Sequence, residues 1–156
     1  TISAYFIIMT QKSPSSDTPH LKGVLETALY VDDLVTARAF YGEILGLELV
    51  TEVEGRHAFF RLGDGMLLIF DPVTTVEPPD QDDALPVPPH GATGAGHACF
   101  AVNTDDLDAW RQRLERRGIH IEADFHWPNG ARSVYFRDPA GNSLELAARS
   151  LWFSDA

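Results

Sequence analysis

The chain repeats one pattern of short runs, and this internal repeat constrains the fold more than any other feature. Residues 25–31 (LETALYV) and 96–102 (GHACFAV) are both strand-like, and each leads into a helix-like stretch that contains the letters DDL. Further strand-like runs follow each helix. Such a period indicates two copies of one supersecondary unit. The sequence therefore predicts an α+β chain built from two tandem βαβββ modules.

The repeat also sets the boundaries of the predicted regions. We expect a disordered or loosely packed N-terminal lead over 1–21, the first module over 22–72, a linker or lid loop over 73–95, the second module over 96–149 and a C-terminal tail over 150–156. The linker is rich in Pro, Asp, Gly and Thr, and a loop of this length inside a compact domain is often a lid or a binding segment. The sequence leaves open whether Met9, within the lead, is the natural start.

Local signals predict the elements of each module. In the first, residues 23–31 alternate as a strand, and residues 32–46 form an amphipathic helix that begins at an Asp and ends at Gly46. In the second, the helix is expected over 104–118, with Thr104 as its N-cap. The other expected strands are 47–53, 57–62, 66–72, 96–102, 119–125, 131–138 and 142–148.

Composition narrows the classes of partner. The hydrophobic fraction of 44% can build a core, whereas the formal net charge of -11 argues against nucleic acid, because a phosphate backbone attracts a basic surface. The single cysteine, Cys99, cannot form an intrachain disulfide, so we expect a cytoplasmic protein. The sequence contains no apolar run long enough to cross a membrane.

Aligning the two halves predicts a candidate metal site. Glu26 falls opposite His97, and Leu68 falls opposite Glu145. Strand alternation directs Glu26, His97 and Glu145 away from the face that packs on the helices. Two carboxylates in a cavity without partners would be costly or would take up protons, whereas a divalent cation removes that difficulty. For His97 taken alone, a hydrogen-bonded structural role is the alternative. For Glu26, the alternatives are a proton-transfer base or a partner for an inward-facing arginine.

These features resemble the vicinal oxygen chelate superfamily, which contains glyoxalase I, fosfomycin-resistance thiol transferases, bleomycin-resistance proteins and extradiol dioxygenases. The resemblance is carried by LYVDDLVTARAFYGEILGLEL in the first half, by GHACFAV, and by YFRDPAGNSLELA near the end. It covers about residues 23–149. It implies an open, cup-shaped mixed sheet of eight strands with the helices outside, and a homodimer whose modules are sometimes exchanged between chains.

The resemblance also implies which positions would bind the metal. The four family ligand positions are Glu26, Leu68, His97 and Glu145 in this sequence. Glu26 replaces the histidine that most metal-binding members carry, and Leu68 cannot coordinate, which departs from the four protein ligands typical of glyoxalase I. Three ligands leave positions open for a substrate. The implied cofactor is a divalent ion, Mn, Fe, Zn, Ni or Mg, and the oxygen-rich set favours the harder ions.

Two functions are consistent with this site. The first is a metal-dependent lyase, isomerase, transferase or dioxygenase that acts on a small substrate chelated through adjacent oxygens, with Glu26 or Glu145 also transferring protons. The alternative is a metal-free protein that sequesters a small molecule, as bleomycin-resistance proteins do. His90 is interpreted as a loop histidine, with closure over the cup as the alternative. The expected substrate-pocket residues are His57, Phe70, Cys99, Trp127 and Tyr135. The sequence leaves open whether the site lies within one chain or across two.

Overall fold

The computed structural model describes residues 19–77 and 85–153. The predicted lead up to residue 18, including Met9, lies outside the described residues, as do linker residues 78–84 and tail residues 154–156. Across the described ranges, none of the helices has the length and apolar character needed to span a bilayer.

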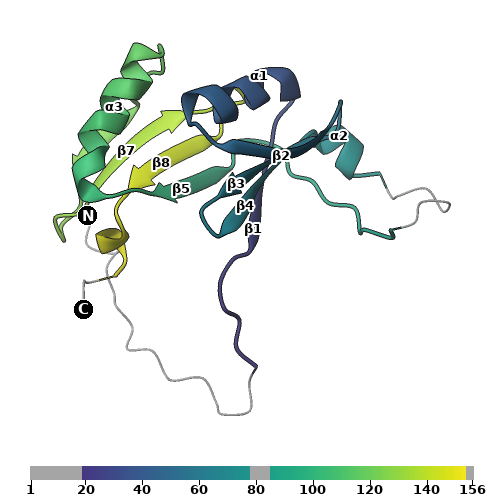
Figure 1. Cartoon of the computed structure of the whole chain (residues 1–156), viewed down its shortest axis with the longest axis horizontal. Helices are drawn as coiled ribbons and strands as arrows, with labels where there is room; N and C mark the ends of the chain where they lie inside the picture. The colour runs from purple at the N-terminus through teal and green to yellow at the C-terminus, as the bar shows by residue number, and fades with distance from the viewer. Residues whose placement is uncertain (1–18, 78–84, 154–156) are drawn as a thin grey trace.

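The order of elements repeats βαβββ in both halves, as the sequence predicts (Figure 1). The first module contains β1 (Glu26–Tyr30), α1 (Leu34–Ala39), the π-helical turn η1 (Phe40–Ile44), β2 (Glu48–Val53), β3 (His57–Leu62) and β4 (Gly65–Phe70). The short helix α2 (Pro72–Thr75) follows. The second module contains β5 (His97–Ala101), the 3₁₀ turn η2 (Thr104–Asp106), α3 (Leu107–Arg116), β6 (Ala123–His126), β7 (Arg132–Arg137) and β8 (Ser143–Ala147), before the 3₁₀ turn η3 (Arg149–Leu151).

Each module forms its own four-stranded mixed sheet. The strand orders, β1-β4-β3-β2 and β5-β8-β7-β6, are equivalent in the two modules. The first strand of each module pairs in parallel with the fourth, and the remaining pairs are antiparallel. The predicted fold class is therefore confirmed, with its eight strands arranged as two sheets.

The first helix begins and ends where the sequence predicts. Asp33 is its N-cap, because Oδ1 accepts the Thr36 N–H at 2.9 Å and Oδ2 accepts the Thr36 hydroxyl at 2.6 Å. The helix then widens into η1, where the Leu45 N–H donates to the Phe40 carbonyl at 3.1 Å. Gly46 ends it with a φ of 73°, in the left-handed region that favours glycine.

The second helix begins later than predicted. Thr104 is not its N-cap but the first residue of η2, which follows Asn103. The side-chain amide of Asn103 donates to Asp106 Oδ2 at 2.8 Å, and this local bond accompanies the tighter first turn. The α-helix proper starts at Leu107.

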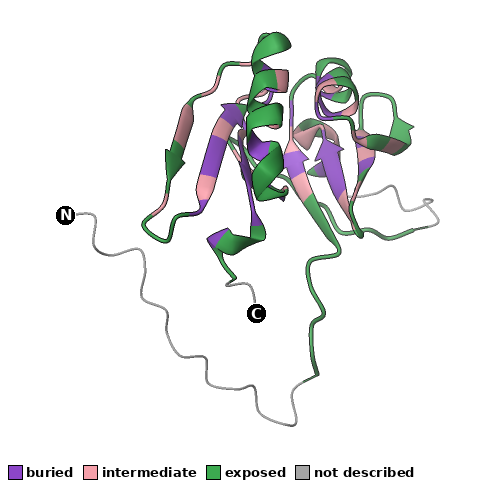
Figure 2. Ribbon diagram, turned by 60° about the vertical axis from the view of Figure 1, so that its left-hand side comes forward, coloured by how far each residue is buried: buried purple, intermediate pink, exposed green. Residues whose placement is uncertain are grey.

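One hydrophobic core joins the two modules. It takes side chains from the helix-facing side of both sheets and from α1 and α3, and Figure 2 shows the buried residues along the strands of both sheets. Leu25 is next to Glu26, so alternation predicts that it faces the core, but it precedes β1 and is 73% exposed. Buried core residues from the two halves include Leu29, Phe60, Ile69, Phe100, Phe136, Leu144 and Leu146.

Polar contacts fix the two modules against each other. The Asn142 side chain, in a residue only 2% exposed, donates to the Tyr30 carbonyl at 3.1 Å and accepts the Gly96 N–H at 2.7 Å. The Tyr41 hydroxyl donates to Asp138 Oδ2 at 2.8 Å. These bonds hold the end of β1 close to the start of β5.

Candidate metal centre

His97 and Glu145 lie side by side on the open face of the second sheet. His97 begins β5, and Glu145 is on β8, which pairs in parallel with β5. His97 Nε2 is 3.4 Å from Glu145 Oε2. Two ligand atoms each about 2.1 Å from one ion are about 3.4 Å apart when the angle at the ion is tetrahedral. The pair therefore has the spacing of two ligands of one cation.

A hydrogen bond to the backbone sets the tautomer of the His97 ring. Nδ1 lies 2.9 Å from the carbonyl oxygen of Ser143. A carbonyl only accepts, so Nδ1 carries the proton, and in the neutral ring Nε2 keeps its lone pair on the side of Glu145. Metal-binding histidines are commonly oriented by such a bond. The ring is thus prepared to bind a cation through Nε2.

Glu145 is 4% exposed and is held by a chain of hydrogen bonds. The Ser133 hydroxyl donates to Oε1, and the Trp127 indole N–H donates to Ser133 Oγ at 2.8 Å. Tyr135 lies beside the same carboxylate. Burial is the larger cause and the contact with Glu145 the smaller one that raise the pKa of Tyr135 to about 12. The carboxylate is therefore oriented through Oε1, while Oε2 remains directed at His97.

Cys99 lies directly across from Glu145 in the register of β5 and β8. Desolvation, followed by the charge of Glu145, raises the pKa of the Cys99 thiol to about 12. A thiol with such a pKa stays protonated at neutral pH, so it is neither a ready nucleophile nor a ready thiolate ligand. Cys99 forms part of the wall beside the pair rather than a reactive group.

Aromatic rings extend this wall along the open face of the second sheet. The rings of His97 and Tyr135 stack at 6.3 Å between centroids, those of Tyr135 and Phe125 at 5.8 Å, and those of Phe125 and Trp127 lie 5.0 Å apart. The predicted pocket residues Trp127 and Tyr135 therefore lie near the pair. Phe125 and Ser133 were missed, although each stands two residues from a predicted pocket residue and so shares its face.

Glu26 does not join His97 and Glu145 within one chain. It is the exposed first residue of β1. Leu68, at the position equivalent to Glu145, is 8% exposed and offers no ligand atom. Among residues 19–77 and 85–153, no three His, Cys, Asp or Glu side chains are grouped so that they could hold one metal ion. The structure thus brings two of the three predicted ligands together and leaves Glu26 apart.

The predicted pocket residues His57 and Phe70 belong to a separate aromatic group on the first sheet. His57 stacks on Phe59 at 4.0 Å, and Phe70 meets Phe59 edge-on at 5.2 Å. His90 of the linker packs against Phe70 at 4.7 Å, and its Nδ1 is 2.7 Å from the Tyr30 hydroxyl. The linker therefore contacts the first sheet through His90. Tyr30 and Phe59 were missed, although alternation places them on the same faces as Glu26 and His57.

The sequence matches the Glyoxalase/Bleomycin resistance protein/Dioxygenase superfamily over residues 23–146. The chain belongs to this superfamily. A lactoylglutathione lyase from Agrobacterium tumefaciens, known from its crystal structure, has 44% sequence identity to this chain. The two structures superpose with a TM-score of 0.80 over 86% of this chain and 98% of that one. The protein YaeR of Escherichia coli is 33% identical over 81% of this chain and 95% of its own length. The metallothiol transferase FosB of Bacillus licheniformis is 24% identical over 83% and 77%.

Proposed function

We propose that this superfamily member is a metal-dependent enzyme whose divalent cation is held by His97 and Glu145 of one chain and by Glu26 of a second. The observation that carries the proposal is the pair itself, a directed imidazole nitrogen 3.4 Å from a buried carboxylate oxygen. When bound, the cation would polarise a substrate oxygen and stabilise negative charge that develops there. A lyase and a transferase among the relatives support an enzyme without selecting one reaction.

A second chain is needed because one chain keeps Glu26 apart from His97. Both residues begin strands at the edge of their sheets. The Asn142 bonds hold β1 and β5 in their present relation, so bringing Glu26 to His97 within one chain would break the junction. Two chains related by a twofold axis each give Glu26 to the other, which makes a closed dimer with two equivalent sites.

The residues around the pair favour a small substrate with two adjacent oxygens. Three protein ligands leave open coordination positions, which such a substrate would fill. Tyr135, with a pKa of about 12, stays protonated at neutral pH and would donate a hydrogen bond in this site. Because Oε1 of Glu145 already accepts from Ser133, Glu26 is the carboxylate better able to move a proton on the substrate.

A metal-free binding protein is the second candidate, and the aromatic wall of the second sheet is the observation in its favour. The nearly parallel rings of Phe125 and Tyr135, inclined by 6°, offer a flat apolar surface. A planar ligand would stack on such a surface without any cation. In that case, the contact between His97 and Glu145 would be structural.

Metal analysis of protein purified without chelators distinguishes the two candidates. We expect about one divalent ion per chain in the wild type and at least tenfold less in Glu145→Gln. Glu122→Gln is the matched control, because Glu122 pairs with Arg137 at 2.7 Å on the exposed surface and should leave the metal content unchanged. A wild type that cannot be loaded with Mn²⁺, Zn²⁺ or Ni²⁺, yet binds aromatic ligands, would overturn the enzyme proposal.

A further inference from the structure

The indole N–H of Trp127 is bonded to another side chain and is therefore not available to a substrate. Its Nε1 lies 2.8 Å from the hydroxyl oxygen of Ser133, a residue with no exposed surface. An indole N–H can only donate, so Ser133 Oγ accepts this bond. The hydroxyl has a single proton, which it donates to Oε1 of Glu145. The donor at the start of this chain of bonds thus determines the direction of both.

This direction leaves Glu145 with one oxygen for a cation. Oε1 receives the Ser133 proton, whereas Oε2 lies 3.4 Å from His97 Nε2. A carboxylate that bound an ion through both oxygens would have to give up or share the bond from Ser133. A carboxylate that binds through one oxygen occupies one coordination position instead of two, so a further position stays open for a substrate.

We propose that Trp127 is a positioning residue, which acts through Ser133 to hold Glu145 so that it binds a divalent cation through Oε2 alone. The proposal rests on the proposed function, in which Glu145 is a ligand of that cation. Trp127 itself would contact neither the ion nor the reacting atoms of a substrate. Loss of a bond that supports a metal ligand typically weakens metal binding about tenfold or more.

The ring of Trp127 is held by the turn η3 that follows the last strand. The buried Leu151 of η3 forms a small apolar cluster with Ala131 and Ala147, and Trp127 packs against this cluster. The Asn129 side chain donates to the Leu151 carbonyl at 3.1 Å, which joins η3 to the turn that begins at Trp127. Because this packing restricts the ring, the end of the described chain helps to aim the indole N–H.

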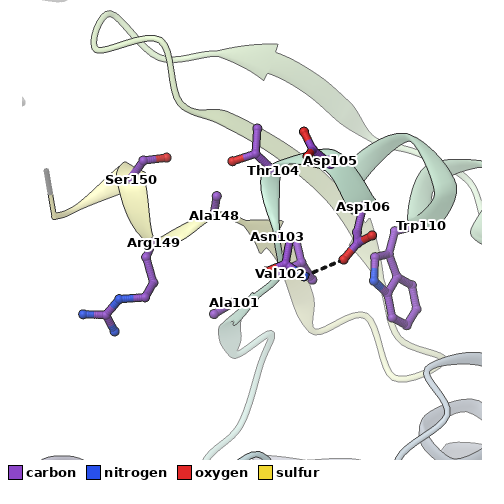
Figure 3. Close-up of a pocket in the computed structure, with 10 residues that line it drawn as sticks. All are labelled: Ala101, Val102, Asn103, Thr104, Asp105, Asp106, Trp110, Ala148, Arg149 and Ser150. Atoms are coloured by element: carbon purple, nitrogen blue, oxygen red, sulfur yellow. Dashed lines mark hydrogen bonds between the residues drawn. The ribbon is translucent and has the colours of Figure 1, made fainter. Parts of the chain in front are cut away.

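A second tryptophan provides a matched control. Arg149 and Ser150 of η3 are exposed and border a hollow of about 650 Å³, together with Trp110 of α3 (Figure 3). Trp110 is partly buried, like Trp127, but it packs against the core that joins the two modules. Substitution of Trp110 therefore removes an indole of similar burial from a different site.

Metal affinity is the first measurement. Trp127→Phe keeps an aromatic ring but removes the N–H that directs the Ser133 proton, so the Kd for Mn²⁺ should rise at least about threefold in isothermal titration calorimetry. Ser133→Ala should raise the Kd at least about tenfold, because it removes the donor to Glu145 itself. Trp110→Phe should leave the Kd unchanged. Equal affinities of Trp127→Phe and Trp110→Phe would overturn the proposal.

Replacement of tryptophan by benzothienylalanine separates the hydrogen bond from packing, because sulfur takes the place of the N–H in a ring of nearly the same shape. Protein grown with this analogue carries it at all three tryptophan positions. The same replacement in Trp127→Phe is the control, since that variant carries the analogue at the other two positions only. The analogue should weaken Mn²⁺ binding in the wild-type sequence and not in the variant. An equal loss in both proteins, or a loss in neither, contradicts a role for the N–H.

The visible spectrum of bound Co²⁺ tests whether Glu145 offers one oxygen. Co²⁺ absorbs visible light more weakly as its coordination number rises. Ser133→Ala frees Oε1 to bind as well, so the absorption should fall below that of the wild type. Leu151→Ala should lower it by less, because it loosens only the packing of Trp127, and Ser150→Ala on the exposed side of η3 should not change it. If Ser133→Ala gives the wild-type spectrum, Ser133 does not keep Oε1 from the ion.

NMR of metal-free, isotope-labelled protein distinguishes failure of this proposal from failure of the enzyme proposal. The indole N–H signal of Trp127 should move in both Ser133→Ala and Glu145→Gln, whereas the signal of Trp110 should stay in place. Stoichiometric metal in the wild type, with a Trp127 signal that ignores Glu145→Gln, keeps the cation and removes Trp127 from its support. A wild type that binds no divalent ion removes the enzyme proposal and the reserved oxygen together, even if the Trp127 signal responds as expected.

Discussion

The two modules share strand order and register but differ in the side chains on their open faces. In the second module, Cys99 lies across from Glu145, whereas in the first Ala28 lies across from Leu68. The second face holds a buried carboxylate with oriented donors; the first holds an aromatic group in contact with His90 of the linker. Two of the three candidate ligands, His97 and Glu145, therefore lie in the second module.

The helix-facing sides of the sheets differ much less. Leu67 and Ile69 of β4, like Leu144 and Leu146 of β8, are at most 2% exposed. Dense packing restricts these positions to apolar side chains of similar volume. The two modules therefore differ mainly on the open faces, where a different side chain leaves the core intact.

The largest effect on stability is expected from a residue that breaks the symmetry of the repeat. Asn142 precedes β8, and its equivalent in the first module is Gly65. A Cβ atom at Gly65 would lie 2.8 Å from the Leu25 carbonyl oxygen, so the first module has no room for an amide there. In the second module, the Asn142 side chain fills the corresponding space and donates to the Tyr30 carbonyl at the end of β1.

Asn142→Ala should lower the free energy of unfolding by about 2–4 kcal/mol in urea denaturation, because it leaves several buried polar groups short of partners. The groups that lose a bond are the Tyr30 carbonyl, the Gly96 N–H and the Asp138 carboxylate. Asn129→Ala is the matched control: its amide donates to the Leu151 carbonyl at 3.1 Å near the surface, and we expect a loss of about 1 kcal/mol or less. Equal losses would show that the junction is not held by Asn142.

A smaller effect is expected from an ion-pair network whose central pair, Arg132 and Asp124, is partly buried in the second module, whereas the pair in the first module is exposed. Arg132 of β7 donates to both oxygens of Asp124 at 2.7 and 2.8 Å and to Asp108 of α3 at 2.6 Å. Its side chain is 19% exposed. In the first module, Arg38 pairs with Glu52 at 2.6 Å, but the two side chains are 55% and 47% exposed.

Arg132→Met should therefore cost about 1–2 kcal/mol of unfolding free energy, and Arg38→Met about 0.5 kcal/mol or less. The hydrogen bond from Arg132 lowers the pKa of Asp124, so its contribution is present above the unfolded pKa and is lost as pH falls through the folded pKa. The difference between wild type and Arg132→Met should thus shrink on acidification below about pH 4. Urea denaturation at several pH values measures this, and a constant difference would contradict the role of Asp124.

Strand alternation was sufficient to predict that His97 and Glu145 share the open face, because the two-residue period depends only on the local backbone. It could not show that Glu26 lies apart from them in one chain. That separation depends on how the modules dock, through bonds such as those of Asn142 and Tyr41 between residues distant in sequence. Thr104 failed as a cap for a more local reason, since the bond between Asn103 and Asp106 accompanies a 3₁₀ turn.

The smallest expected effect is on the titration of a thiol placed at equivalent positions of the two sheets. In chelator-treated protein, Ala28→Cys in a Cys99→Ser background puts the thiol across from Leu68 instead of Glu145. Desolvation comes first and the Glu145 charge second in raising the pKa of Cys99 to about 12, and the transplanted thiol lacks the second cause. Its pKa should therefore be lower than that of Cys99.

The rate of iodoacetamide alkylation against pH checks this expectation, since only the thiolate reacts. The alkylation profile of Ala28→Cys should begin at a lower pH than the profile of native Cys99. Glu145→Gln should move the Cys99 profile in the same direction, because it removes the charge but keeps the shape of the side chain. Coincident profiles for Cys99 and the transplanted thiol would mean that desolvation alone suppresses the thiolate. The carboxylate that distinguishes the second module would then have no electrostatic effect on its neighbour across the strands.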